Sequence, residues 1–187
     1  SGFIFAKVLS RVIPALSTIT SKPPCFAAAV LIFSPASAAV ISIANTEPPI
    51  ESLIKRYQHT HQFKTFEKAA YAWIQDYATQ LLGLVIPLYV KYGIALEAHL
   101  QNSVVTFNKD GALDMIYIRD FEGLRIDNEQ LNNAGFTTQH FHEKSRILTN
   151  SKTSVFNKMF YSTVQNHLGE LVITIAKYSN SKVLEQE

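Results

Sequence analysis

The hydrophobic period of the sequence changes at Gly93, and this change limits the possible folds more than any other feature. From about Thr65 to Tyr92, apolar residues recur at helical spacing, which predicts one long helix. Pro87 is expected to kink its last turns, and Gly93 stands where a C-cap glycine is typical. The apolar face of this helix is expected to carry Trp73, Tyr77, Leu81, Leu84 and Leu88.

Two short runs rich in β-forming residues follow the helix. They span Ser103 to Phe107 and Leu113 to Ile118, and Asn108-Lys109-Asp110-Gly111 separates them. An Asp-Gly pair between alternating apolar runs is a strong signal for a tight turn. The pattern therefore predicts an antiparallel β-hairpin.

The rest of the chain reads as mainly helical. A helix is expected over Ile50 to Tyr57 after Glu47-Pro48-Pro49, and residues 127–150 read as short helices and loops. A final helix is expected from about Ser154 to Tyr178. Its apolar face would carry Phe156, Phe160, Val164, Leu168, Leu171 and Ile175. The predicted fold class is α+β, a predominantly helical domain with a central antiparallel β-hairpin, and residues 1–187 are a single domain or a fragment.

The first 45 residues are harder to interpret. Residues 1–22 fit a strand or a helix equally well, while Phe26 to Ile43 is almost uncharged and about long enough to cross a bilayer. Ala36-Ser37-Ala38 resembles a signal-peptide cleavage site, but it lies far from the terminus. A core helix broken near Pro35 is the favoured interpretation, with a membrane span or signal peptide as the alternative.

Composition excludes several classes of function. The net charge of +2 gives no support for binding to nucleic acid or to an anionic membrane. The single cysteine, Cys25, excludes an internal disulfide and fits a reducing compartment, so a cytoplasmic location is expected. One cysteine also cannot hold an iron–sulfur cluster, which argues against a ferric reductase.

Polar residues gather where the hairpin strands begin and end. His99, Gln101 and Asn102 precede the first strand, and Asp120 follows the second. Strands of similar length bring their open ends together, so Asn102 and Asp120 are expected to lie close to each other. Amide and carboxylate oxygens suit Mg²⁺, and His99 and Gln101 can donate hydrogen bonds to a phosphate. The spacing alone equally allows Asn102 and Asp120 to cap turns and His99 to be a core histidine.

The remaining histidines give weaker signals. His140 and His142 have the spacing of a metal-binding pair, but the sequence offers no further ligand. His59 and His61 are expected in an exposed loop, and His167 is expected to pack against the apolar face of the last helix.

Three segments resemble a known family. GIALEAHLQN (residues 93–102) is similar to the G-I-x-L-E-A-H-x-Q-N signature of NRPS-independent siderophore synthetases of the aerobactin synthetase type. YIRDFEGLRI (117–126) resembles the R-D-x-x-G-x-R segment of that family, and NHLGEL (166–171) resembles a later helical element. Weaker similarity extends from about Ile13 to Ile175.

The resemblance implies an ATP- and Mg²⁺-dependent ligase for siderophore biosynthesis and iron acquisition. Such enzymes adenylate the carboxylate of citrate or a citrate derivative, and an amine, hydroxylamine or alcohol then displaces AMP. His99, Gln101 and Asn102 would contact ATP phosphates or the metal, with His99 as the catalytic residue. Asn102 and Asp120 would hold the Mg²⁺.

The resemblance leaves the roles of three charged residues less defined. Glu97 would orient the loop. Arg119 and Arg125 would either pair with an anionic substrate or form structural ion pairs.

The implied fold is that of the C-terminal, FhuF-like palm domain of these synthetases, which are often dimers. The His-Pro-x-His-Pro-x-x-Lys-x-Arg-type signature of the N-terminal ATP-binding region is not found in the chain. We therefore expect the chain to be inactive alone and to need the remainder of the synthetase. Two alternatives remain: a non-catalytic remnant or interaction module, and a kinase-like small-molecule phosphotransferase. Affinity for Mg-ATP separates the remnant from both enzymes. The released product, pyrophosphate or phosphate, separates the synthetase from the phosphotransferase.

Overall fold

The computed structural model describes residues 49–139, 141–142 and 145–184. Its first helices are α2 (Pro49–Thr60) and α3 (Phe66–Tyr92), so both predicted helices of this region are confirmed. The interpretations of Cys25, of residues 1–22 and of the apolar segment 26–43 lie outside the described residues. Within the described part of the chain, no helix combines the length and apolar character needed to cross a membrane.

Helix α3 begins and ends at the residues that the sequence indicates. The Thr65 hydroxyl accepts a hydrogen bond from the Lys68 N–H at 3.4 Å, and Gly93 closes the helix with a left-handed φ of 66°. Pro87 lies within the helix near its end. Of the predicted apolar face, Trp73, Tyr77 and Leu81 are buried, and Leu84 and Leu88 pack against the core partly buried.

The hairpin is also confirmed. Strands β2 (Ser103–Phe107) and β3 (Leu113–Ile118) pair antiparallel, with a bulge between Thr106 and Phe107. The Asn108 side chain organises the turn, because its oxygen accepts hydrogen bonds from two backbone N–H groups beyond it. Trp73 donates a hydrogen bond to the carbonyl of Gly111 at 2.8 Å, which joins the turn to α3.

A second, smaller sheet was missed by the sequence analysis. It consists of β1 (Ile94–Ala95), β4 (Arg125–Asp127) and β5 (Leu148–Thr149), with β4 in the middle. Strand β4 is antiparallel to β1 and parallel to β5. Strands of two or three residues are too short to show an alternating period, so residues 127–150 read only as short helices and loops. The helix in that region is α4 (Asn128–Asn133).

The final helix is continuous but not uniform. It runs through α5 (Lys152–Met159), the π-helix η4 (Phe160–Gly169) and α6 (Glu170–Leu184). The predicted apolar face is wrong in its first half. Phe156 and Phe160 are 44% and 37% exposed, while Val155 and Met159 are buried. A π turn is closed by i→i+5 hydrogen bonds and holds more residues than an α turn, so η4 shifts the buried face by one residue relative to a pure α-helix.

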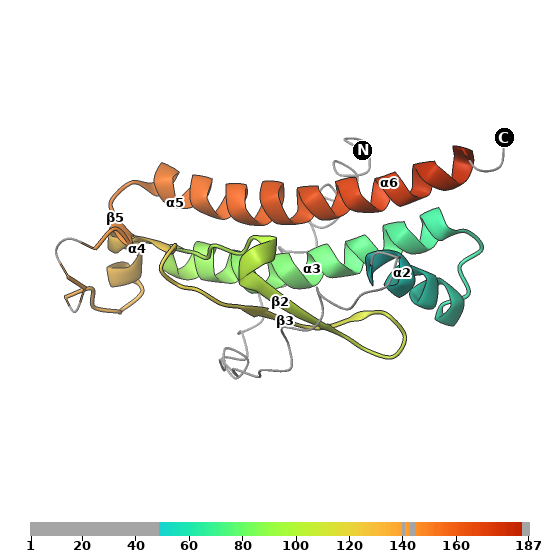
Figure 1. The fold of residues 1–187 in the computed structure, drawn as a ribbon. Coiled ribbons are helices and arrows are strands. Elements are labelled where there is room, and N and C mark those ends of the chain that lie inside the picture. Colours follow the sequence, from blue (N-terminus) through green and yellow to red (C-terminus); the bar gives the residue numbers. More distant parts are fainter. Residues whose placement is uncertain (1–48, 140, 143–144, 185–187) are drawn as a thin grey trace.

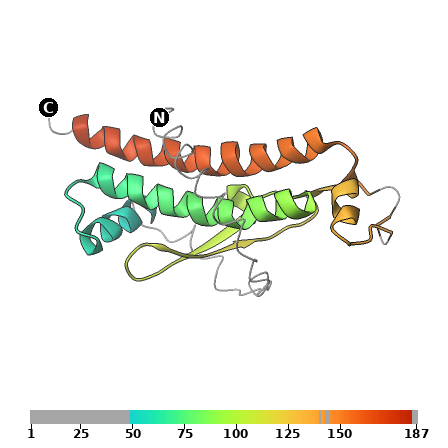
Figure 2. The same cartoon turned by 180° about the vertical axis from the view of Figure 1, so that it is seen from behind.

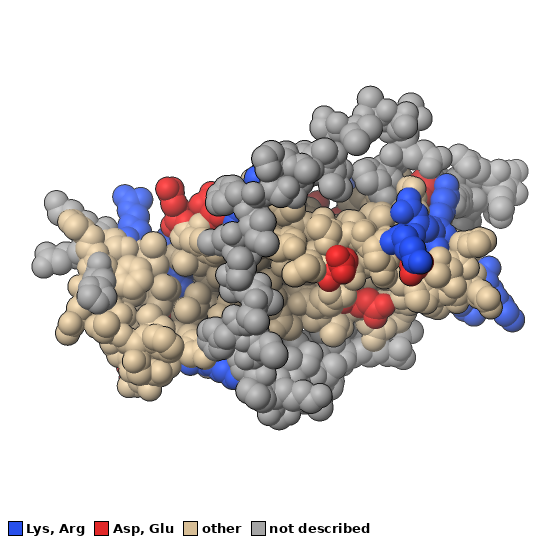
Figure 3. Space-filling model, turned by 90° about the horizontal axis from the view of Figure 1, so that it is seen from below, with Lys and Arg blue, Asp and Glu red and all other residues tan. Residues whose placement is uncertain are grey.

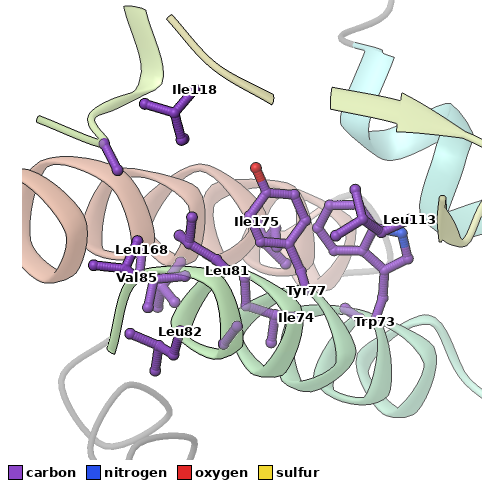
Figure 4. Close-up of a cluster of buried hydrophobic side chains, with 14 of the residues drawn as sticks. Trp73, Ile74, Tyr77, Leu81, Leu82, Val85, Leu113, Ile118, Leu168 and Ile175 are labelled. Atoms are coloured by element: carbon purple, nitrogen blue, oxygen red, sulfur yellow. The ribbon is translucent and has the colours of Figure 1, made fainter. Parts of the chain in front are cut away.

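Helix α3 is the middle layer of the molecule. In Figures 1 and 2 the helix α5–η4–α6 runs along one side of α3, and the β2–β3 hairpin lies on the other side. Figure 4 shows α3 contributing Trp73, Ile74, Tyr77, Leu81, Leu82 and Val85 to the core, against Leu113 and Ile118 of the hairpin and Leu168 and Ile175 of the final helix. The fold is mixed α+β and mostly helical, as predicted.

The described charged side chains that are visible on the hairpin side are of both signs. In Figure 3, which views the molecule from below, the Lys and Arg side chains of the described residues are interspersed with Asp and Glu.

Candidate functional site

The two motif segments meet at the open end of the hairpin. The loop after β1 passes through the short 3-10 helix η3 (Leu100–Asn102) into β2, and η3 begins after His99. Ser103 pairs with Ile118, and the Arg119 N–H donates to the Asn102 carbonyl at 2.8 Å. The backbone therefore places Asn102 opposite Arg119, with Asp120 one residue further along.

Asp120 has an unusual backbone conformation. Its φ is 62°, in the left-handed region that residues other than glycine seldom adopt, although Asp and Asn tolerate it best. The side chain is exposed, and its Oδ1 accepts a hydrogen bond from the Glu122 N–H at 3.2 Å. Such conformations are concentrated at functional sites, so this one is compatible with a ligand-binding role for the Asp120 carboxylate.

The other polar residues at this end differ in exposure. Gln101 is exposed and His99 half-buried, while Asn102 is only 9% exposed. Arg119 directs two guanidinium nitrogens to the Gln101 carbonyl, at 3.2 and 3.0 Å. These hydrogen bonds tie the two hairpin ends together; they are neither the structural ion pair nor the substrate contact expected for Arg119, and both of those roles stay predictions.

Glu97 links the loop to the final helix. Its carboxylate forms an ion pair with the ammonium of Lys158 in α5 at 2.5 Å, and the same oxygen lies 3.9 Å from Nε2 of His99. All three side chains are about one quarter exposed, so they are partly shielded from solvent. Sequence reasoning missed Lys158, because a lysine in the exposed stripe of an amphipathic helix gives no distinguishing signal.

Gly123 fixes the position of Glu97. A Cβ atom added at Gly123 would lie 1.4 Å from Oε2 of Glu97 and 2.4 Å from its Cδ, so the carboxylate lies directly against this glycine. Gly123 belongs to the segment 117–126, and Glu97 belongs to the segment 93–102. The two segments that resemble the family are therefore in steric contact through these two residues.

We expect Gly123→Ala to displace Glu97 without unfolding the protein. The clash involves the end of a flexible side chain, so Glu97 can rotate away, but it then loses its position beside Lys158 and His99. Any activity that depends on this cluster should fall about tenfold or more, because small displacements in a site are costly. Steady-state rates and thermal melting of the variant measure both effects.

The matched control is Gly83→Ala in the middle of α3. A Cβ there meets nothing within 4 Å, and alanine is favoured in helices, so stability should rise slightly and activity should not change. Wild-type activity in Gly123→Ala would show that the placement of Glu97 is unimportant.

A hollow of about 560 Å³ lies beside this cluster. Arg125 and Lys158 give it two cationic groups, and side chains of the final helix complete its wall. These are the polar residues Ser154, Asn157, Tyr161 and Gln165 and the apolar ring of Phe160. The two cations make the hollow compatible with an anionic ligand of moderate size.

The other described histidines are either buried in the core or exposed on the surface. His167 is fully buried, as its expected packing role requires. His61 is exposed, and His59 is also exposed but lies in the last turn of α2 and not in a loop. His140 is outside the described residues, so the disfavoured metal-binding alternative for His140 and His142 is not tested. Among the described residues, no group of three or more His, Cys, Asp or Glu side chains could hold a metal ion.

Comparisons with known proteins identify the family. Residues 71–182, more than half of the chain, match the family described as "Ferric iron reductase FhuF-like transporter". This matched region contains most of α3, the hairpin, the motif loop and nearly all of the final helix.

Three relatives come from Staphylococcus aureus (strain NCTC 8325 / PS 47). A D-ornithine–citrate ligase is 66% identical over 142 residues, which are 76% of this chain and 22% of the relative. An L-2,3-diaminopropanoate–citrate ligase is 30% identical over 60% of this chain and 19% of its own length. Staphyloferrin A synthase is 31% identical over 57% of this chain and 18% of its own length. The chain thus belongs to the NRPS-independent siderophore synthetase family, and it spans about a fifth of the length of these relatives.

Proposed function

We propose that this chain is the palm-domain part of an ATP- and Mg²⁺-dependent siderophore synthetase that joins citrate, or a citrate-derived carboxylate, to an amine. The observation that carries the proposal is the meeting of the two motif segments at the hairpin end, beside the Glu97–Lys158 pair. The relatives named as ligases of citrate with ornithine and diaminopropanoate support the choice of reactants. The family description also mentions a reductase, but a chain with one cysteine cannot supply a cysteine-ligated iron–sulfur cluster.

The donor groups at the hairpin end suit a Mg-nucleotide. Asn102 and Asp120 offer amide and carboxylate oxygens, and Mg²⁺ is usually bound by one or two carboxylates together with phosphates and water. The metal would supply positive charge to the phosphates. His99 and Gln101 would donate hydrogen bonds to phosphate oxygens. Glu97 would hold His99 and Lys158 in place.

In the proposed reaction, a carboxylate oxygen of citrate attacks the α-phosphorus of ATP and pyrophosphate leaves. An amine then attacks the acyl carbon, the bond to AMP breaks, and the amine loses a proton. Hydroxylamine and alcohol nucleophiles would follow the same course. Because the leaving group is highly charged, a site rich in hydrogen-bond donors is needed to stabilise it.

The hollow beside Lys158 is the place we propose for the anionic substrate. Arg125 and Lys158 would pair with carboxylates, which is the role the resemblance allows for Arg125. The remainder of the synthetase would supply the ATP-clamping cations, so this chain alone would be inactive. We propose the cytoplasm as its location and a homodimer as its assembly.

The test uses the longest reading frame that contains this chain. The protein is incubated with citrate, Mg-ATP and a panel of amines, and pyrophosphate and phosphate are measured separately. Pyrophosphate that depends on citrate supports the synthetase. Release of ADP or phosphate without pyrophosphate would favour a phosphotransferase, and an absence of ATP binding would indicate a remnant without chemistry.

The role of Asp120 can be tested separately. We expect Asp120→Asn to raise the Mg²⁺ concentration needed for half-maximal activity by at least about tenfold, since a charged ligand is lost. Asparagine tolerates the left-handed φ and can still accept the hydrogen bond from Glu122, so the fold should persist. A magnesium titration of the steady-state rate provides the measurement.

Asp114→Asn is the matched control for this titration, because Asp114 is an exposed aspartate in the hairpin but lies away from its open end. Equal magnesium requirements in wild type and Asp120→Asn would remove Asp120 from the metal site.

A further inference from the structure

Side chains from other elements hold the loop that carries His99 by its carbonyl groups. The Ala98 carbonyl lies 2.8 Å from Nδ1 of His167, and the His99 carbonyl accepts a hydrogen bond from the Ser103 hydroxyl at 2.9 Å. The Ser162 hydroxyl lies 3.1 Å from the Leu96 carbonyl and 2.7 Å from the Lys158 carbonyl, so its one proton is shared between the two. The carbonyls on both sides of the His99 α-carbon are therefore fixed.

His167 is suited to this contact by its chemistry. A carbonyl can only accept, so Nδ1 carries the proton, and Nε2 then accepts a hydrogen bond from the Tyr77 hydroxyl at 2.8 Å. The side chain is completely buried, and this burial lowers its pKa to about 4. His167 is thus neutral at physiological pH, with both ring nitrogens satisfied.

The π-helix η4 makes this arrangement possible. Ser162 and His167 are five residues apart, and in an α-helix such residues point about 140° away from each other. A turn closed by i→i+5 hydrogen bonds brings residues five apart close to the same side. Both side chains in fact reach the same loop, at Leu96 and Ala98. An α-helix of the same sequence would direct only one of them there.

We propose that η4 positions the His99 loop, with His167 as the main positioning residue and Ser162 as the second. His167 is not a catalytic residue, because it is buried beneath the loop; it acts by fixing the peptide group that precedes His99. π segments are rare and are often found at functional sites, which agrees with this role. The consequence for activity rests on the proposed function, whereas the consequence for loop order does not.

The experiment compares three variants of the full-length synthetase. His167→Leu removes the donor to Ala98, while His167→Asn places an amide N–H at the same distance along the side chain as Nδ1. Tyr77→Phe removes the other hydrogen bond of the same histidine and leaves the loop contact intact. Hydrogen exchange of residues 96–102 and the rate of pyrophosphate release are measured for each.

We expect His167→Leu to lower kcat about 10- to 100-fold, with a small change in the KM for ATP, because the loop is displaced and not removed. Exchange across residues 96–102 should accelerate in parallel. His167→Asn should recover a large part of both, and Tyr77→Phe should resemble wild type in the loop. If His167→Leu does not fold, Ser162→Ala provides a milder change within the same π segment.

Unchanged loop exchange in His167→Leu would overturn the proposal. Equal loss in His167→Leu, His167→Asn and Tyr77→Phe would also overturn it, because general destabilisation would then explain the effect. A wild-type enzyme that releases no pyrophosphate would count against the proposed function only, because the exchange measurements still test the positioning by His167.

Discussion

Replacing His99 with alanine in the full-length enzyme should lower kcat for citrate-dependent pyrophosphate release by about 100- to 1000-fold, the usual effect of removing one donor to a developing charge. The fold should tolerate the change. His99 precedes η3 but its side chain makes no capping hydrogen bond, and its contact with Glu97 is long, at 3.9 Å. Steady-state kinetics with a thermal melt on the same sample would show a large kinetic effect and a small structural one.

His59→Ala is the matched control, because His59 is an exposed histidine in the last turn of α2 and outside the site. It should leave the rate and the melting temperature unchanged. A His99→Ala enzyme with a normal rate would remove His99 from the proposed site. A large drop in melting temperature would instead mean that His99 is structural, which the spacing of the sequence alone allows.

The parts of the fold that could be predicted are those in which local signals agree. Helix α3 combines a Thr65 N-cap, a long apolar face and a Gly93 C-cap, and the hairpin has an Asp-Gly turn between alternating runs. In both elements the sequence preference and the tertiary environment favour the same structure. The predicted boundaries of the hairpin strands therefore coincide with the observed ones.

The final helix shows where such reasoning fails. A constant period of ~3.6 residues places Phe156 and Phe160 on the same face as Leu168. The π segment changes the period, and Val155 and Met159 are buried in their place. No feature that we recognise in the local sequence predicts the π-helix η4. Its consequence is tertiary, since it lets Ser162 and His167 reach the same loop.

The part of the candidate site at the hairpin ends could be predicted from the sequence, but its contacts with the final helix could not. His99, Gln101, Asn102 and Asp120 were found because they cluster at the ends of two predicted strands. Lys158 and Gly123 were not found, since their roles depend on contacts with Glu97 that only the packing creates. A glycine inside a family motif is a usable signal of close approach, but it does not identify the partner.

The largest expected change in stability is that of Gly111→Ala in the hairpin turn. Gly111 has a φ of 82°, and a Cβ there would lie 2.4 Å from the Leu53 carbonyl oxygen of α2. Neither atom is at the end of a flexible side chain, so the turn must move away from α2. This movement also disturbs the hydrogen bond from Trp73 to the Gly111 carbonyl. We expect a loss of about 2–4 kcal/mol in the stability of the hairpin, from backbone strain and overpacking together.

Gly135→Ala separates these two causes. Gly135 also has a positive φ, of 89°, but a Cβ there meets nothing within 4 Å, so only the backbone strain of about 1–2 kcal/mol should appear. Denaturant titration of the full-length protein gives the loss of unfolding free energy for each variant, and native-state hydrogen exchange of residues 103–118 reports the opening free energy of the hairpin in Gly111→Ala. A clearly larger loss in Gly111→Ala than in Gly135→Ala would show that the contact with α2 holds the turn. Equal, small effects of both substitutions would mean that the hairpin is stable without its contact with α2. The open end of the hairpin at the candidate site would then not depend on the contact between Gly111 and Leu53.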